Sequence, residues 1–379
     1  MNDKDVNHLH VIAFDMPFPP NYGGSTDMYF KLVELQKLGI NVTLHVFLYD
    51  GKSAAPELND VTFKTIYYSR KRYKNPFIGK LPYIVKTRKN EQLFQNLLKD
   101  NAPILFEGLH TTYYMNHPKL QHRIRVVRAH NVEHHYYAAL NEAEDHWLKK
   151  IFFKIEAKKL EKYEQVLNLA DGIAGISPAE TKYLNDTYGK TQYIPAFHSN
   201  NKVVCRVGSG DFVLYHGNLS VPENNRAALF LAEEVFPKLN FPCIISGSNP
   251  SARLIKAVSK FEHISLKANI STSEILELIE SAHVNAMITF QSTGIKLKLL
   301  NSLYRGRFVV ANLAMVDQTQ LEELCAISDS AEGLVAEINK CFEHDFSIEY
   351  QEHRKKILME LFDNSSNAVK LAKMLNLIP

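Results

Sequence analysis

The sequence predicts an α/β fold with two doubly wound, Rossmann-like domains, each built on a parallel sheet covered by helices. Three observations lead to this prediction. Strand-like apolar runs alternate with helical patterns in the first half of the chain. The alternation starts again after an irregular stretch at 194–210 that is rich in Ser, Asn and Gly. The length of 379 residues also exceeds what one ordinary core accommodates. Because strands that alternate with helices favour parallel sheets, each half is expected to form its own domain.

The N-terminal domain is assigned to residues 1–196. Short apolar runs of strand length predict buried strands, and longer segments with helical spacing predict helices. The expected strands are 10–14, 41–48, 62–68, 103–106, 124–128 and 172–175, and the expected helices are 26–38, 90–99 and a long region around 134–170.

The C-terminal domain is assigned to residues 197–345, and residues 346–379 are expected to form a helix that closes the structure. The expected strands are 212–215, 242–246, 263–266, 284–290 and 308–311, with helices at 224–239, 251–261, 272–282 and 296–304. Ligands of doubly wound sheets bind at the carboxyl ends of the strands, so the loops that follow these strands are the candidate binding loops.

The composition is typical of a soluble globular protein, with 45% hydrophobic and 22% charged residues. No apolar run approaches the roughly 20 residues that span a bilayer. The polar start at 1–7 predicts no signal peptide. The four cysteines (Cys205, Cys243, Cys325 and Cys341) lie far apart, which indicates reduced thiols without a zinc site. We therefore expect a cytoplasmic protein.

Positive charge is concentrated in the first half of the chain. Residues 1–190 carry a net charge of +5, and the remainder carries −2. The segment Arg70–Lys89 contains eight basic residues, no acid and several aromatics, and a second basic, aromatic segment begins at Trp147. Such segments attract anionic lipid headgroups, which suggests a membrane surface as partner, or they form solvated helix faces beside a core stripe. Because no nucleic-acid-binding module is recognisable, no nucleic-acid partner is expected.

A phosphate site is predicted after the apolar run Val284–Phe290. Gly294 gives a turn there, and Lys296 and Lys298 open the next helix. Unpaired N–H groups at a helix start and the helix dipole favour an anion, and the two lysines add full charges.

An uncharged counterpart follows the first strand of the chain. The loop from Pro19 to Ser25 contains Gly23 and Gly24, and a helix begins directly after it. Glycine allows a ligand to approach the backbone closely, because no side chain stands in the way. Two such loops in separate halves suggest a ligand held between two domains. The loop lacks the spacing of a dinucleotide fingerprint.

The residues His130 to His134 spell the inverted zinc-protease motif H-x-x-E-H. That chemistry needs both histidines on one face of a helix. His130 instead follows the strand-like run 124–128 directly, so it is expected to cap a strand. The only D-x-D sequence, at Asp3 and Asp5, precedes every expected strand. No metal site is therefore predicted.

These loops, in this order and spacing, resemble the GT-B-fold glycosyltransferases, specifically the family 4-like group of retaining bacterial sugar transferases. The resemblance covers nearly the whole chain. It rests on Pro19–Gly24, Val127–Glu133, Gly175–Ser177, Tyr215–Leu219, Thr293–Leu300 and Gly306–Val310.

The resemblance implies a nucleotide-sugar donor, as substrate and without a further cofactor, that lies against the second domain in a central cleft. Fixed cations and helix N-termini would stabilise the departing diphosphate without metal. The implied donor-binding residues are Gly23, Gly24, Gly217, Asn218, Gly294, Lys296, Lys298 and Asn301.

The first domain would bind the acceptor, which is expected to be a glycan or a lipid-linked molecule. His110, at a predicted strand end, would touch the transferred sugar or position the acceptor, and His130 is the second candidate catalytic residue. Glu107, Asn131 and Glu133 are expected to line the acceptor side of the cleft. The alternative for His110 is a hydrogen-bonded core histidine.

The chain departs from the resemblance at two positions. The related enzymes usually carry two glutamates eight residues apart around the phosphate helix, and this sequence has Thr293 and Asn301 there. The main expectation is a glycosyltransferase of cell-surface polysaccharide or glycoconjugate assembly. It is expected to be cytoplasmic, and the basic segments of the first domain suggest a peripheral position at the inner membrane face. The alternatives are a catalytically silent relative that binds a partner, and a sugar-nucleotide epimerase on the same fold.

Overall fold

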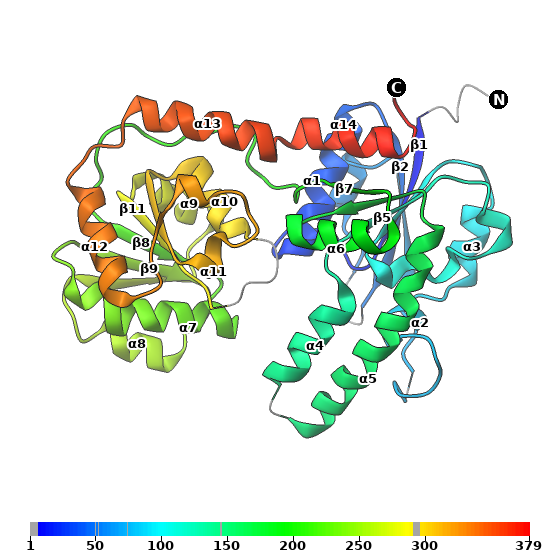
Figure 1. Cartoon of the computed structure of the whole chain (residues 1–379), viewed down its shortest axis with the longest axis horizontal. Coiled ribbons are helices and arrows are strands. Elements are labelled where there is room, and N and C mark those ends of the chain that lie inside the picture. Colours follow the sequence, from blue (N-terminus) through cyan, green and yellow to red (C-terminus); the bar gives the residue numbers. More distant parts are fainter. Residues whose placement is uncertain (1–6, 50, 52, 74, 145, 291–295) are drawn as a thin grey trace. The chain divides into compact units, whose positions relative to one another are not determined.

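The computed structural model describes residues 7–49, 51, 53–73, 75–144, 146–290 and 296–379. The chain forms two compact units (Figure 1). Unit 1 comprises residues 1–199 and 362–379, and unit 2 comprises residues 200–361. The chain therefore enters unit 2 once and returns to unit 1 for its last segment.

Unit 1 contains a seven-stranded parallel sheet in the order β3-β2-β1-β4-β5-β6-β7. The strands are β1 (His8–Ala13), β2 (Asn41–Leu48), β3 (Lys64–Ser69), β4 (Ile104–Glu107), β5 (Arg125–Ala129), β6 (Gly172–Gly175) and β7 (Thr191–Tyr193). The strand order reverses between β1 and β4, and this reversal point is where doubly wound sheets place their ligands.

Both faces of this sheet are covered. Successive side chains of a strand point to opposite faces, so Val11 and Ala13 join one core cluster and Ile12 joins the other. The unit 1 helices are α1 (Gly23–Lys37), α2 (Tyr83–Lys86), α3 (Glu91–Leu97), α4 (Glu133–Ala143), α5 (Trp147–Tyr163), α6 (Pro178–Tyr188) and α14 (Asn364–Met374). Helix α14 packs on α1.

The long helical region expected around 134–170 divides into two helices. Glu144, whose backbone is extended, ends α4, and α5 begins at Trp147. The two helices pack against each other along their lengths (Figure 1). The resulting α4–α5 hairpin is the part of unit 1 that carries the second basic, aromatic segment.

Unit 2 contains a six-stranded parallel sheet in the order β10-β9-β8-β11-β12-β13. Its strands are β8 (Val213–His216), β9 (Cys243–Gly247), β10 (Ile264–Ala268), β11 (Val284–Met287), β12 (Phe308–Ala311) and β13 (Ala326–Ile327). Its helices are α7 (Pro222–Phe230), α8 (Ala252–Val258), α9 (Thr272–Ser281), α10 (Leu297–Arg305), α11 (Leu313–Val316), α12 (Ala331–Phe342) and α13 (Ile348–Phe362). The strand order here reverses between β8 and β11.

The single closing helix expected at 346–379 is two helices. Asp363 separates α13 from α14 and caps α14, since its Oδ2 accepts a hydrogen bond from the Ser366 amide at 2.8 Å. All but the last residue of α13 belongs to unit 2, whereas α14 belongs to unit 1. The predicted fold class of two parallel, helix-covered sheets is confirmed. No helix in the described part of the chain is both long and apolar enough to cross a membrane.

Candidate active site

A buried ionic cluster lies close to the point where the strand order of the unit 1 sheet reverses. Asp27 and Lys31 are one turn apart on α1, Glu107 ends β4, Arg128 lies in β5 and His130 follows β5. The Lys31 ammonium lies 2.9 Å from Asp27 and 2.8 Å from Glu107. The Arg128 guanidinium lies 2.7 Å from Asp27, and His130 Nε2 lies 2.8 Å from Glu107. Each carboxylate is thus shared by two basic side chains.

The ion pairs of this cluster offset the free-energy cost of burying its charges. The side chains of Asp27, Lys31, Glu107 and Arg128 have no exposed surface. Burial alone would raise the pKa of Asp27, but Arg128, Lys31 and His130 reverse the effect and hold it well below its usual range. Lys31 and His130 likewise lower the pKa of Glu107. The two carboxylates therefore stay ionised inside the protein.

The cluster also ties down the end of unit 1. Arg128 donates to the carbonyls of Ile194 and Pro195, and Asp27 accepts from the Phe197 amide at 2.9 Å. The irregular stretch at 194–210 is therefore fixed against α1 and β5 at its start. Sequence reasoning missed Asp27, Lys31 and Arg128 as a group, and the only local signal is the i,i+4 spacing of the first two.

His130 and His110 lie on either side of Phe14, the residue that follows β1. The His130 ring meets the Phe14 ring edge-on at 5.0 Å, and the His110 ring stacks on it at 5.2 Å. His110 sits in the 3₁₀ turn Leu109–Tyr114, which follows Gly108 at a φ of 67°. A left-handed residue is needed there to turn the chain sharply after β4. The structure therefore brings the two predicted catalytic histidines together.

Glu133 begins α4 and faces His110. The distance between His110 Nδ1 and Glu133 Oε1 is 3.6 Å, which is longer than a hydrogen bond. Burial, with the nearby Glu180 charge, raises the pKa of Glu133 to about 8. Burial, with the charges of Arg88 and His130, holds the pKa of His110 well below its ordinary value. Near neutral pH both groups are uncharged.

Since His130 precedes α4 and Glu133 opens it, the H-x-x-E-H residues do not share one helical face. The zinc-protease interpretation, which the sequence analysis set aside, gains nothing from the geometry. His134 is committed elsewhere, because its Nδ1 lies 3.0 Å from Glu164.

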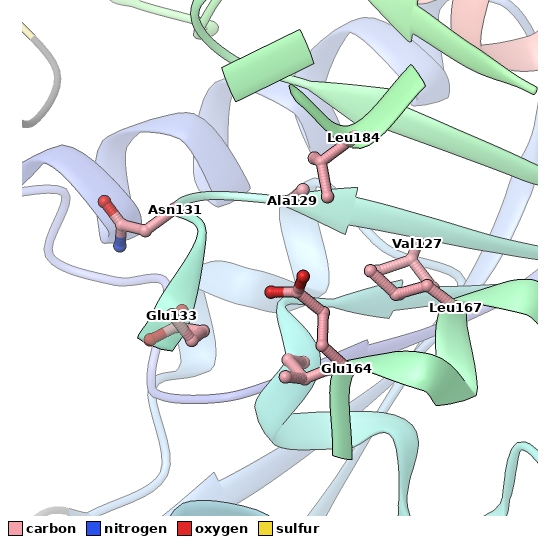
Figure 2. Close-up of a pocket in the computed structure, with 8 residues that line it drawn as sticks. Val127, Ala129, Asn131, Glu133, Glu164, Leu167 and Leu184 are labelled. Atoms are coloured by element: carbon pink, nitrogen blue, oxygen red, sulfur yellow. The ribbon is translucent and has the colours of Figure 1, made fainter. Parts of the chain in front are cut away.

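A small pocket lies under this part of unit 1, lined by Leu109, Val127, Ala129, Asn131, Glu133, Glu164, Leu167 and Leu184 (Figure 2). Its volume of about 10 Å³ has room for roughly one water molecule and not for a sugar. Glu164 is held there by the hydroxyls of Tyr183 and Tyr188 as well as by His134. The pocket is therefore a feature of packing beside Glu133.

Gly23 and Gly24 start α1 next to the same phenylalanine. A Cβ on Gly24 would lie 2.9 Å from the Phe14 ring and 3.0 Å from the Tyr22 ring, so the Phe14 ring would have to shift to admit a side chain there. The Ser25 hydroxyl accepts from the amides of Asn21 and Tyr22 at 3.2 Å, which fixes the loop. The predicted contact of these glycines with a donor stays a prediction.

Glu107, predicted to line the acceptor side, is fully buried and engaged by Lys31 and His130. It therefore holds these two side chains in place at the end of β4. Asn131 is half-buried and borders the small pocket. The predicted contacts of both residues with an acceptor stay predictions.

In unit 2 the predicted phosphate helix is α10, which Lys296 precedes. Gly294 lies outside the described residues. The Lys298 ammonium is hydrogen-bonded to Asn224 Oδ1 and the Ile288 carbonyl at 3.1 Å, and lies 5.3 Å from the Tyr215 ring centre. None of these partners is negatively charged. Burial lowers the pKa of both lysines to about 8, and the charge of Lys296 adds to this effect on Lys298.

Glu223, on the first turn of α7, is a residue that sequence reasoning missed. Its Oε1 accepts from the Thr289 hydroxyl at 3.0 Å and from the Phe290 amide. It thereby fixes the chain where it leaves β11 and approaches the predicted phosphate loop. Its charge also raises the pKa of Lys296 and Lys298 against the effect of burial.

Gly217 and Asn218 form the loop after β8, opposite Lys298 across Asn224. A Cβ on Gly247 would lie 1.9 Å from the Gly217 carbonyl oxygen, so the two backbones touch. The Asn218 Oδ1 accepts from the Ser220 amide and from the hydroxyls of Ser220 and Ser248. Asn218 thus organises the loop.

Asn301, one turn further along α10 than Lys298, is paired with another amide. Its Oδ1 accepts from Asn200 Nδ2 at 2.9 Å, and Asn200 Oδ1 accepts from Arg305 Nε at 3.1 Å. The structure therefore groups Gly217, Asn218 and Lys298 around Asn224 and holds Asn301 by a separate hydrogen-bond chain.

Solved structures with this architecture match nearly the whole chain. They include sucrose-phosphate synthase from Thermosynechococcus elongatus, with a TM-score of 0.67 and 15% identity over 97% of this chain and 98% of that one. A glycosyltransferase from Rickettsia africae has a TM-score of 0.66 and 13% identity over 97% of both chains. TarM from S. aureus has a TM-score of 0.66 and 11% identity over 99% of this chain and 100% of that one. The chain therefore has the GT-B fold, as the sequence predicted.

The chain is also similar in sequence to a curated protein of Klebsiella pneumoniae. That protein is described as an uncharacterized 44.6 kDa protein in the cps region. The two are 24% identical over 318 residues, which cover 79% of this chain and 81% of the relative. No protein-family model matches the sequence.

Replacing Lys31 by methionine should destabilise unit 1 strongly. The change removes one cation from two buried carboxylates, and losing one partner of a buried ion pair costs about 3–5 kcal/mol. Urea unfolding followed by circular dichroism measures the loss. Lys37→Met is the matched control, since Lys37 is 55% exposed in its pair with Glu34, and such pairs are worth about 0–1 kcal/mol. Equal stability of the two variants would show that the cluster is not stabilising.

The raised pKa of Glu133 predicts a pH-dependent stability. The folded protein keeps the Glu133 proton up to about pH 8, whereas the unfolded chain releases it near 4.5. Stability from this group is therefore fully present below pH 4.5 and is lost as the pH rises towards 8, by up to about 1.4 kcal/mol per pH unit. In Glu133→Gln the loss should disappear, so the variant gains on the wild type between pH 5.5 and 7.5 in urea unfolding.

Glu142→Gln, an exposed change on the same helix, should follow the wild-type pH dependence. If the wild type and Glu133→Gln run parallel with pH, Glu133 is not protonated in the folded protein.

Proposed function

We propose that the protein is a glycosyltransferase that moves a sugar from a nucleotide-diphosphate sugar to a glycan or a lipid-linked acceptor. The observation that carries the proposal is the GT-B fold along nearly the whole chain, shared with a sucrose-phosphate synthase and a protein titled glycosyltransferase. Other matches were solved with UDP and glucose, or with UDP-L-rhamnose. We extend the nucleotide-sugar donor from these proteins to this chain.

Unit 2 supports the donor role through Lys298. Negative charge grows on the diphosphate as the glycosidic bond breaks, and a fixed cation stabilises that charge most when water is excluded. The Lys298 ammonium is largely buried, has neutral partners, and stands at the start of α10 beside the carboxyl ends of β8 and β11. We propose that Lys298, aided by Lys296 and the α10 N-terminus, holds the diphosphate, with metal-independent transfer and retention of configuration.

Unit 1 supports the acceptor role through its strand edge. His110 and Glu133 are uncharged near neutral pH. Neutral groups with both donor and acceptor capacity suit the hydroxyls of a sugar. We propose that this pair orients the acceptor and that His130, held by Glu107, lies next to it.

We further propose a role in capsule or other surface-polysaccharide assembly. The support is the Klebsiella pneumoniae relative, whose name places it in a cps region. A cytoplasmic location agrees with the four free cysteines, since reduced thiols are the rule inside cells.

Nucleotide binding tests the donor site. At least one diphosphate of a panel of UDP, GDP, ADP and CDP should bind the full chain in isothermal titration calorimetry. Lys298→Ala should weaken that binding at least about tenfold, the effect of losing one charge-assisted hydrogen bond. Because the Lys298 pKa is about 8 and the anion binds its protonated form, wild-type affinity should fall as the pH rises above 8.

Lys256→Ala removes an exposed lysine of the same unit and should bind like the wild type. If no nucleotide of the panel binds, the chain is a silent relative with the same fold. If a nucleotide binds equally well to Lys298→Ala, the donor site lies elsewhere.

We propose, as a finer point, that unit 1 attaches to an anionic membrane surface through one exposed patch. The patch consists of Phe77, Ile78, Leu81, Trp147, Leu148 and Ile151, with Lys149 and Lys150 exposed beside it. Trp147 is 66% exposed and Ile78 is 62% exposed. The two segments adjoin, because Lys159 of α5 donates to the Phe77 carbonyl and the Phe77 ring lies edge-on to Phe152. Exposed tryptophan beside lysine suits the interface of an anionic bilayer.

Vesicle flotation tests this patch. Vesicles with 30% phosphatidylglycerol should carry the wild type, and Trp147→Gln/Leu148→Gln should reduce the bound fraction severalfold because apolar burial is lost. The charge change Lys149→Glu/Lys150→Glu should reduce it too. The control Lys182→Glu/Lys190→Glu alters exposed lysines outside the patch and should bind more than the Lys149/Lys150 variant. Binding that is equal in all four proteins would reject the patch.

A further inference from the structure

Two arginines at the strand edge of unit 1, Arg70 and Arg88, have no carboxylate partner among the described residues. Arg88 is 1% exposed, and its guanidinium donates to the Phe14 carbonyl at 2.7 Å, the Ile84 carbonyl at 2.6 Å and the Tyr49 hydroxyl at 2.9 Å. All three acceptors are neutral. Within the part of the chain that the structure describes, neither Arg88 nor Arg70 forms an ion pair.

Arg70 is the more accessible of the two. It follows β3, is half-buried, and stacks its guanidinium on the Tyr49 ring at 4.4 Å, with the Tyr83 ring at 5.7 Å. Its Nε is buried and makes no hydrogen bond to any described residue. Stacking occupies the face of a guanidinium and leaves its N–H edge to form bidentate bonds with an oxyanion.

Other buried arginines without a carboxylate are compensated differently. Arg307 donates to the carbonyls of Glu280, Ser281 and Ala282 at the end of α9, and Arg354 donates to those of Leu303 and Gly306 at the end of α10. The C-terminal end of a helix carries partial negative charge, which suits a cation.

Arg88 has only one carbonyl of the four-residue helix α2, and a second cation lies beside it. Glu133, on which Arg88 acts electrostatically, keeps its proton near neutral pH because burial raises its pKa to about 8. Among the described residues, no carboxylate pairs with either arginine, and burying such charge is costly unless an anion completes it.

The position of this charge coincides with the proposed acceptor site. Phe14, Tyr49, Arg70, His110 and Glu133 follow β1, β2, β3, β4 and β5 in turn. These five strands are parallel neighbours, so their carboxyl ends lie along one edge. Both arginines also act electrostatically on His110, whose pKa they help to lower.

We infer that the acceptor bound by unit 1 carries an oxyanion, a carboxylate or a phosphate, and that the Arg70 guanidinium binds it. Arg88 is a positioning residue. It is more deeply buried than Arg70, fixes the Tyr49 hydroxyl by a hydrogen bond, and adds positive potential at the Arg70 guanidinium. This inference rests on the proposed function, and it names the chemical class of the acceptor. A neutral sugar would leave Arg70 without a charged partner and would bind more weakly.

Binding of matched sugars to the full chain tests the inference. Glucuronate, glucose 6-phosphate and glucose share a ring and differ in the acidic group. Saturation-transfer-difference NMR titrations should show the two acidic sugars binding at least tenfold tighter than glucose. Arg70→Gln should remove that preference, and Arg70→Lys should keep part of it. Lys71→Gln removes an exposed positive charge from the adjacent residue and should stay within twofold of the wild type.

A diphosphate on a lipid is the second source of the same chemistry. Farnesyl diphosphate below its micelle concentration is the probe for it. Tighter binding of farnesyl diphosphate than of either acidic sugar, lost in Arg70→Gln, would place the oxyanion on a lipid carrier. Preference for glucuronate or glucose 6-phosphate would place it on the glycan. Equal binding of glucose and the acidic probes to the wild type, or no effect of Arg70→Gln, would overturn the inference.

Circular dichroism melting of each variant separates lost binding from lost folding. Nucleotide titration of the same samples keeps this test apart from that of the proposed function. If nucleotides bind and the acidic probes show no Arg70 dependence, the acceptor inference fails and the glycosyltransferase proposal stands. If no nucleotide binds, the glycosyltransferase proposal fails whatever Arg70 does.

Discussion

The interaction on which unit 1 depends is the sharing of Asp27 between Lys31 and Arg128 inside the protein. It joins α1 to β5, and through Lys31 to Glu107 at the end of β4. The same carboxylate receives the Phe197 amide, so the last part of the chain before unit 2 is fixed as well. Removing charges from water is costly, and this arrangement is stable because each carboxylate of the cluster has two basic neighbours. The cluster helps to position the candidate site residues. Glu107 holds His130, and the loop after β4 places His110 against Phe14, which His130 also contacts.

Charged groups with an ion-pair partner and cations without one among the described residues lie at different positions along the strands. Below the carboxyl edge of unit 1, the acids and bases of the Asp27 cluster are matched. Among the described residues, Arg70 and Arg88 at the edge itself pair with no acid, and in unit 2 the partners of the Lys298 ammonium are neutral oxygen atoms. A protein interior tolerates such cations where helix ends or ligands supply the missing negative charge. In doubly wound sheets the carboxyl edge is where ligands bind. The unmatched cations therefore lie where an anionic donor and an anionic acceptor would complete them.

Much of the fold could be predicted from the sequence, because apolar runs and helical spacing are local patterns. The strand sets agree except for short β7 and β13, whose two or three residues give too little pattern to detect. The sequence predicted one long helical region around 134–170 where the structure has two helices, because the break at Glu144 to His146 carries no glycine or proline. Lys298 and His110 could be found because each lies shortly after a clear strand. The Asp27 cluster and the role of Glu223 could not, because they depend on contacts between residues 60 to 170 positions apart.

The departures at Thr293 and Asn301 bear on whether the donor site is complete. Thr293 lies outside the described residues, whereas Asn301 is held in a chain of bonds through Asn200 and Arg305 to Glu280. Its side-chain oxygen is used by Asn200, so the amide N–H₂ is the part of Asn301 that remains for a ligand. In the proposed donor site, a glutamate in this place would accept hydrogen bonds from a ribose hydroxyl, and asparagine would donate one to the hydroxyl oxygen instead. Since a hydroxyl both donates and accepts, the substitution reverses the direction of the bond and keeps the capacity to form it. On that proposal, the positive charge of Lys298 would contribute more of the donor affinity here than it would beside a glutamate.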